Sequence, residues 1–325
     1  MLAILMASCS KNEPQAPDKD AWIYDLSLPV PIRFGSATPL TKAAVESLEG
    51  LEISLWGFDK YADLGYIHDS LILFNNAHIT VQGGVIETGK YYPRDSKHHY
   101  AFYACYPRKN NPKEINGDIH VTAPLNGEID YLWACARTTG DGYNAKFIRE
   151  NSSKQPTLTF EHVLASIDFV ALADSNSNQN TDSDFTGITV KSVTVKNVPS
   201  NGTLVVAGAE EGNIINLTDE KDVLVFSGEE NPTISGTSLG SQYLICPNEE
   251  GYDIEVKAYY AAFNETVTMI FKTGQLVKGQ KYVFQIKFHK AEDITINIVN
   301  PTWDSTSTYT VDFDQENPTP ELQDS

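Results

Sequence analysis

The sequence has no long hydrophobic run and few positive charges. No apolar stretch approaches the roughly 18 to 20 residues that a membrane-spanning helix needs. Lys and Arg number 24 against 43 Asp and Glu, so the formal net charge is −19. A surface of that sign repels the phosphate backbone of DNA and RNA. The sequence therefore predicts no nucleic-acid partner.

Several motifs of catalytic and metal-binding chemistry are also missing. The sequence contains no H-E-x-x-H, P-loop or G-x-G-x-x-G pattern. Its four cysteines show no C-x-x-C or Cys/His spacing typical of a metal site. Cys105 and Cys135 are interpreted as buried thiols, with a disulfide between them as the alternative. We predict that the protein is not an enzyme and that it has no cofactor and no metal.

The N-terminus resembles an export signal. The apolar residues 2–7 lead into Ser8 and Cys9, and small residues directly before a cysteine resemble a bacterial lipobox. In such signals a diacylglyceryl group is attached to the cysteine sulfur, and cleavage makes the cysteine the first residue. We expect a lipoprotein signal over residues 1–8, lipidation of Cys9, an anchor in the outer membrane and a polar tether over residues 9–25. The alternative is a cytosolic protein with an apolar start.

Residues 26–34 alternate strictly between apolar and other side chains, which predicts a half-buried strand. The apolar positions are Leu26, Leu28, Val30, Ile32 and Phe34. The amide groups of residues i and i+2 face the same edge of a strand, and proline has no N–H. Pro29 and Pro31 therefore predict a strand that pairs well on one side only. The alternative is an ordinary edge strand that stays permanently in place.

Short strands separated by turn residues recur along the rest of the chain. The predicted strands are 51–57, 66–74, 77–81, 84–87, 99–106, 118–122, 130–137, 158–173, 188–198, 203–207, 213–217, 222–226, 242–246, 252–260, 265–272, 280–289 and 293–299. This spacing predicts an all-β protein built from β-sandwiches. A polar break before residue 156 suggests two domains, over residues 26–155 and 156–315, followed by a flexible tail over residues 316–325.

Aromatic-rich segments occur in a particular order over nearly the whole chain. Besides the lipobox they are Ile32-Arg33-Phe34, Thr41-Lys42 before the strand 51–57, Tyr91-Tyr92-Pro93, the run 100–107, the run 160–167, Gly279-Gln280-Lys281-Tyr282 and Trp303. Together they resemble the fimbrillin family, the subunits of type V pili of anaerobic gut and oral bacteria. The resemblance implies two tandem transthyretin-like β-sandwich domains, export as a cell-surface lipoprotein and assembly with other pilus subunits into a fimbria.

The resemblance also implies proteolytic removal of the N-terminal segment at the cell surface. In the family the cut usually follows an Arg in a Thr-Arg-like context, and Lys42 holds the matching position here. We therefore expect cleavage between Lys42 and Ala43, with Arg33 as the alternative site. Loss of the first strand would open a groove that an extended segment of an incoming subunit fills.

A candidate for the incoming strand lies near the C-terminus. Tyr309, Val311 and Phe313 alternate with polar residues, and this run contains no proline. A strand that leaves a sheet exposes amides, carbonyls and side-chain pockets, which together form a template for another chain. The candidate run could supply the two donors that Pro29 and Pro31 lack. The alternative is a plain final strand that completes its own sheet.

Two other functions share the same predicted architecture. A surface glycan-binding lipoprotein of a nutrient-uptake system would present exposed tryptophans as a sugar-stacking platform, and the candidates are Trp22, Trp56, Trp133 and Trp303. Trp56 and Trp133 lie within apolar strands, which is typical of core residues. A tip or accessory adhesin of the same pilus would keep the fold and contact a host or bacterial surface ligand.

Overall fold

The computed structural model describes residues 20–37, 47–59, 72–82, 84–94, 98–115, 118–138, 142–152, 154–173 and 187–288, and it gives strand placement alone for 294–300 and 307–311. Almost all regular structure in these ranges is β-strand, which confirms the all-β prediction. The helices described are a 3-10 turn η1 (Ala21–Ile23) and α1 (Ala145–Glu150). Neither described helix has the length and hydropathy of a bilayer-spanning segment.

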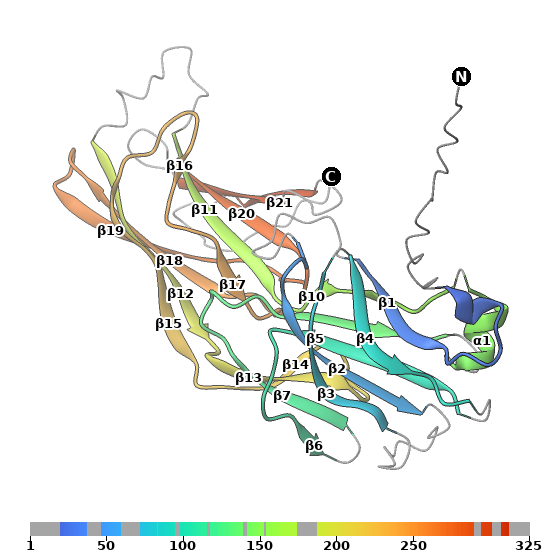
Figure 1. The fold of residues 1–325 in the computed structure, drawn as a ribbon. Helices are drawn as coiled ribbons and strands as arrows, with labels where there is room; N and C mark the ends of the chain where they lie inside the picture. The colour runs from blue at the N-terminus through green and yellow to red at the C-terminus, as the bar shows by residue number, and fades with distance from the viewer. Residues whose placement is uncertain are drawn as a thin grey trace, which may run out of the picture.

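The first sandwich consists of two sheets, which we call A and B (Figure 1). Sheet A has the order β4-β1-β9, with β4 (Val85–Tyr91), β1 (Pro31–Ala37) and β9 (Thr157–Thr159). Sheet B has the order β10-β8-β5-β2-β3, with β10 (Glu161–His162), β8 (Leu132–Ala136), β5 (Tyr100–Tyr106), β2 (Glu52–Asp59) and β3 (Ile72–Thr80). Their facing side chains form one apolar core.

Sheet B also packs against a third sheet, C, on its other face. Sheet C has the order β14-β13-β7-β6, with β14 (Ile214–Thr218), β13 (Asn201–Ala207), β7 (Asp118–Pro124) and β6 (Lys113–Ile115). Trp56 and Trp133 of sheet B join a second core cluster with Val121 and Leu204 of sheet C. Because sheet B is the middle layer, β2 and β5 are buried on both faces, which explains their nearly continuous apolar sequences.

The second sandwich consists of sheets D and E. Sheet D has the order β16-β11-β20-β21-β22, with β17 also paired to β11; its strands are β16 (Thr237–Ser238), β11 (Ala165–Ala173), β20 (Lys281–Phe288), β21 (Ile294–Asn300), β22 (Ser307–Val311) and β17 (Tyr243–Ile245). Sheet E has the order β15-β12-β18-β19, with β15 (Lys221–Glu230), β12 (Ile188–Val198), β18 (Asp253–Tyr260) and β19 (Glu265–Lys272). A third cluster of buried side chains fills the space between them.

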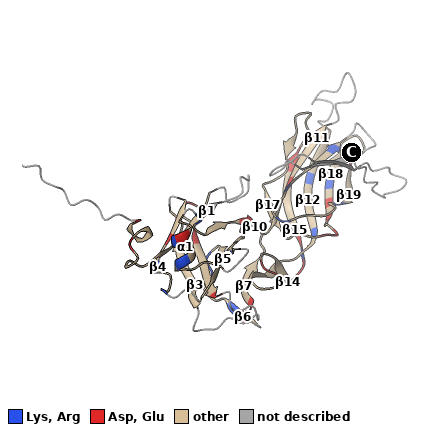
Figure 2. Cartoon of the chain, turned by 90° about the vertical axis from the view of Figure 1, so that its right-hand side faces the viewer, with Lys and Arg blue, Asp and Glu red and all other residues tan. Residues whose placement is uncertain are grey.

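The two sandwiches meet near β10 and β17 (Figures 1 and 2). Backbone hydrogen bonds run from Leu244 N to Gly127 O at 2.9 Å and from Gly279 N to Leu164 O at 2.9 Å. In addition, β13 belongs to the second half of the sequence but pairs with β7 of the first half. The division at residue 156 stays a prediction. Strands that follow residue 156 in the sequence occur in the sheets of both sandwiches and in sheet C.

Candidate functional site

Strand β1 lies in the middle of sheet A, between β4 and β9. It runs antiparallel to β4, whereas its parallel pairing with β9 covers only Gly35–Ala37. Within the predicted range 26–34 the pairing partner in the described structure is β4, and the pairing with β9 begins at Gly35, beyond that range. Gly35 N donates to Pro156 O, while Val30 O accepts from Tyr92 N on the β4 side. The main-chain N–H and C=O groups of odd-numbered residues thus point toward β9. Pro29 and Pro31 lie before Gly35, the first residue of β1 that pairs with β9.

The expected strand over residues 26–34 is wrong in its first half. Leu26 and Leu28 are 77% and 37% exposed, and they precede β1. The Asp25 carboxylate accepts hydrogen bonds from the amide and the hydroxyl of Ser27, at 2.8 and 2.6 Å, and this local turn replaces extended structure. These two hydrogen bonds, the hydroxyl first, lower the pKa of Asp25. The second half of the pattern agrees with the prediction: the buried side chains are Val30, Ile32 and Phe34.

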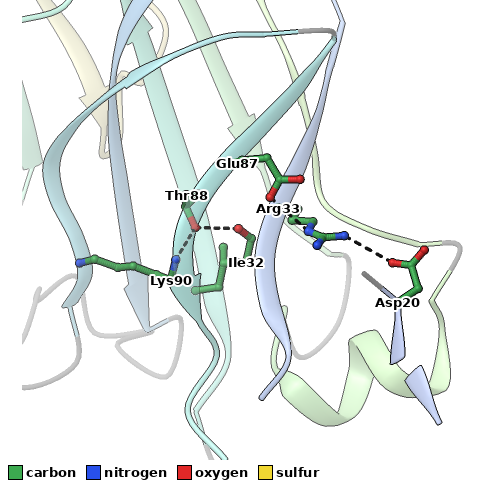
Figure 3. Close-up of polar contacts among 6 residues, drawn as sticks. All are labelled: Asp20, Ile32, Arg33, Glu87, Thr88 and Lys90. Carbon is green, nitrogen blue, oxygen red and sulfur yellow. Dashed lines mark hydrogen bonds and ion pairs between the residues drawn. The ribbon is translucent and has the colours of Figure 1, made fainter. Parts of the chain in front are cut away.

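The ladder between β1 and β4 contains an irregularity at its centre. Pro31 is opposite Tyr91 but Arg33 is opposite Glu87, so β4 carries extra residues at this point. Gly89 takes a φ of +68° there, a conformation that favours glycine. The Thr88 hydroxyl donates to Ile32 O at 2.6 Å in place of a backbone amide (Figure 3).

Arg33 forms ion pairs on the outer side of β1. Its guanidinium lies 3.2 Å from Glu87 and 3.4 Å from Asp20 (Figure 3). Both carboxylates are 62% exposed, so each pair contributes at most about 1 kcal/mol. The outer contacts therefore hold β1 weakly.

The inner side of β1 occupies the centre of the first core. Phe34 is fully buried, and its ring packs edge-on against Phe102 with a centroid distance of 4.8 Å. A Cβ atom added at Gly57 would come within 2.8 Å of the Phe102 ring and within 2.9 Å of the Phe74 ring. Because Gly57 has no side chain, the Phe102 ring can occupy the space beneath β1. The rings of Phe102 and Phe74 form the floor beneath β1, and removal of β1 would uncover it.

Arg149 holds the segment before β1. Helix α1 begins after Asn144, whose side chain accepts a hydrogen bond from Phe147 N at 2.8 Å. Arg149, in the last turn, donates from Nη1 to the carbonyls of Trp22 and Asp25 and from Nη2 to that of Leu28. One side chain of α1 therefore binds three main-chain carbonyls of the N-terminal segment.

The candidate incoming strand lies at the edge of sheet D. Tyr309 and Val311 belong to β22, which pairs with β21. The strand is placed as the final strand of its own sheet, as the alternative interpretation expects. Phe313 lies outside the described residues, as do Cys9, Lys42 and Ala43.

Comparisons with known proteins decide the family. The family model described as fimbrillin-like matches residues 41–303. The chain is a member of the fimbrillin-like family. No curated protein sequence matches it. Among solved structures, a fimbrial protein from Bacteroides vulgatus is similar with 14% identity and a TM-score of 0.52, over 85% of this chain and 98% of that one. A proposed cell adhesion protein from Bacteroides uniformis has 15% identity and a TM-score of 0.50, over 86% and 96%.

Membership confirms the resemblance seen in the sequence. A fimbrillin-like protein is a structural protein of the cell surface, and the β-sandwich architecture agrees with its solved neighbours. The family therefore implies a non-enzymatic role and assembly with other pilus subunits.

Among the described residues of this fimbrillin-like protein, the other candidate catalytic and metal-binding side chains form no reactive cluster. Gly236–Gly240 matches G-x-S-x-G, but Ser238 lies on the edge strand β16 and not on the strand-to-helix turn that exposes a nucleophile. His98 is bound to Asp59, and His99 Nδ1 lies 3.1 Å from Asn144 Nδ2. No group of three or more metal-ligating side chains occurs among the residues described.

The cysteines of this fimbrillin-like protein are thiols where the structure describes them. Cys135 is opposite Tyr103 and Cys105 is opposite Trp133, so the two cysteines are diagonal neighbours on adjacent strands. Burial raises the pKa of Cys105 and of Cys246 to about 12, which makes both thiols unreactive near neutral pH.

The described tryptophans form no exposed platform. Trp22 is 5% exposed, Trp56 is fully buried, and Trp133 donates from its indole to Val206 O at 2.7 Å. Sequence reasoning missed Arg149, because a lone arginine in a six-residue helix carries no pattern that points to a segment more than 120 residues away.

Proposed function

We propose that this protein is a pilus subunit that is exported as a lipoprotein and assembles by exchange of its first strand. In this scheme Cys9 carries the lipid, cleavage after Lys42 frees the N-terminal segment, and Tyr309, Val311 and Phe313 of a neighbouring subunit replace Val30, Ile32 and Phe34. The single observation that carries the proposal is the contrast within β1: its side chains fill the core while its backbone pairs incompletely.

The backbone pairing of β1 with β9 stops short of the two prolines. The β1 residues paired with β9 in the described structure are Gly35, Ser36 and Ala37, and Pro29 and Pro31 have no N–H to offer on the same edge. A proline-free strand offers an N–H at the positions of Pro29 and Pro31 on this edge, so it would pair better than β1.

The same exchange would conserve apolar burial. Val30, Ile32 and Phe34 are 1%, 1% and 0% exposed, so their positions must be filled by apolar or aromatic side chains. Val311 and Phe313 match Ile32 and Phe34 in size, and Tyr309, Val311 and Phe313 alternate as a strand requires. The energy gained would come from better backbone pairing and not from a larger core.

Truncation after Ser307 tests the proposal. The chain lacking residues 308–325 should fold as a monomer and accept a neighbour's strand but fail to extend a polymer. The control is the full chain with Phe263→Ser, which changes an exposed side chain at the β18–β19 turn. Cleavage by a Lys-specific protease should give an N-terminus at Ala43 and a ladder of oligomers on a gel. Normal ladders from the truncated chain would refute strand exchange.

A further inference from the structure

Two arginines of the first sandwich bind the main chain of the segment that precedes β1. Arg149 binds three of its carbonyls, and α1, which carries Arg149, lies beside the segment (Figure 1). Arg94, which follows β4, donates from Nη2 to Ser27 O at 3.0 Å. Hydrogen bonds from a charged donor are stronger than those between neutral groups. Both arginines belong to the part of the chain that would stay behind when the N-terminal segment leaves.

The segment is folded so that its carbonyls reach these arginines. The 3-10 turn η1 ends at Ile23, and the last carbonyls of a helical turn have no partner within it. The turn closed by Asp25 and Ser27 follows directly. Of residues 20–29, Trp22 alone is buried; it is 5% exposed and belongs to the core cluster of the first sandwich. The segment is therefore held by one side chain and by its main chain.

We infer that Trp22, Arg94 and Arg149 form a latch that keeps the N-terminal segment bound after cleavage and sets the rate at which it leaves. The inference rests on the proposed processing and strand exchange, and it adds positioning residues to them. Cleavage after Lys42 cuts the chain on the C-terminal side of β1, whereas the latch lies on its N-terminal side. Cleavage by itself therefore breaks none of the latch contacts.

The latch also lies outside the part of β1 that an incoming strand replaces. The proposed exchange fills the positions of Val30, Ile32 and Phe34, whereas the latch contacts end at Leu28. A displaced β1 would stay tethered through the latch, next to the groove that it has left. A tethered strand has a high effective concentration at that groove and competes with the incoming strand. The latch thus slows assembly after cleavage, and its loss should speed assembly.

Release of the segment from the chain cleaved after Lys42 provides the first test. The cleaved wild-type protein should retain the segment on a sizing column, and mass spectrometry of the freed segment measures its release over time. Trp22→Ala should release the segment about tenfold faster, as expected for a buried aromatic anchor. This change lies in the segment itself, so the protein left behind is identical to the wild type. Immediate loss of the wild-type segment, or release of Trp22→Ala at the wild-type rate, would overturn the latch.

Variants of Arg149 test the other half of the latch. Arg149→Ala removes three charge-assisted hydrogen bonds and should also speed release about tenfold. Arg149→Lys keeps the charge but lacks the planar guanidinium that spans three carbonyls, so its rate should lie between the two. Arg108→Ala, at an exposed arginine paired with Glu52, is the control and should release the segment at the wild-type rate. Equal rates for Arg149→Ala and Arg108→Ala would contradict the role of Arg149.

Hydrogen exchange tests the latch in the uncut chain. The amides of Ile23, Asp25 and Leu28 donate to carbonyls within the segment. They should exchange faster in Arg149→Ala than in the wild type, because the segment opens more often when Arg149 no longer holds it. The amides of β5 should stay protected, which shows that the sandwich remains folded. Unchanged exchange at the three amides would show that the segment is held without Arg149.

Ladders of oligomers separate the latch from the strand exchange. If both are correct, cleaved Arg149→Ala should form ladders severalfold faster than the cleaved wild type. If the variants release the segment faster but no cleaved protein forms ladders, the latch stands and strand exchange fails. If ladders form and neither Trp22→Ala nor Arg149→Ala changes release or growth, strand exchange stands and the latch is refuted.

Discussion

Strands β1 and β11 each run inside a sheet, but they are held in different ways. β11 pairs with β20 in continuous register from Ser166 to Ala173. β1 has four register partners on β4, with a shift among them, and three on β9. The Thr88 hydroxyl supplies a hydrogen bond that the backbone pairing of β1 lacks, and Arg149 holds the segment just before β1. A strand can therefore be essential to a core and still be weakly joined to its sheet.

The difference between a strand that is exchanged and a strand that stays should be largest when a buried core side chain is removed. Phe34→Ala in β1 and Phe284→Ala in β20 remove equally buried rings, so each should lower the free energy of unfolding by about 3–5 kcal/mol. Polymers should behave differently, because Phe34 leaves with the displaced strand. Fibres of Phe34→Ala should resist heat like the wild type, and fibres of Phe284→Ala should not. Equal loss in both fibres would contradict the departure of β1.

The floor beneath β1 provides a smaller effect. Gly57→Ala should destabilise the first sandwich by about 1–3 kcal/mol, because the added methyl meets the rings of Phe102 and Phe74. In the second sandwich Gly187→Ala places a methyl 3.7 Å from Ala261, which is ordinary contact. Urea unfolding of both variants measures the contrast, and equal midpoints would show that the floor can relax.

The hydroxyl that bridges β1 and β4 should contribute less. Thr88→Val removes the donor to Ile32 O, and we expect a loss of about 1 kcal/mol together with faster release of the cleaved N-terminal segment. Thr268→Val on the exposed face of β19 serves as the matched change. Release rates are measured by mass spectrometry of the freed segment. An unchanged rate for Thr88→Val would mean that the bridge does not hold β1.

Lowering the pH should have the smallest effect on how firmly the N-terminal segment is held. The pKa of Asp25 is lowered below its usual value of 3.8, mainly by the Ser27 hydroxyl. The carboxylate therefore stabilises the turn above pH 3.8, and this contribution is lost as pH falls through the lowered pKa. Release of the cleaved segment should accelerate in that range for the wild type. Asp25→Asn should show less of this dependence, and identical profiles would exclude Asp25 as the cause.

The sequence predicted those parts of the fold that depend on local pattern. Alternation correctly placed Val30, Ile32 and Phe34 in the core, and apolar runs marked the buried strands β2 and β5. Alternation failed at Leu26 and Leu28, because a short turn closed by Asp25 and Ser27 has the same apolar spacing as a strand.

Long-range partners could not be predicted in this way. The pairing of β1 with β9 and of β13 with β7 joins segments about 80 to 120 residues apart, and nothing in a single strand specifies its neighbour. Arg149 belongs to the same class, since its role depends on where α1 lies in space. The lipidation and cleavage sites at Cys9 and Lys42 stay predictions.

The crossing of β13 into sheet C has a mechanical consequence. Pulling one sandwich away from the other loads the ladder between β7 and β13, which joins Asn201–Ala207 to Ile119–Pro124 along most of both strands. Hydrogen bonds of a paired ladder resist such a pull, whereas a flexible linker simply extends. A tensile force along the molecule would thus pass through a sheet from one body to the next.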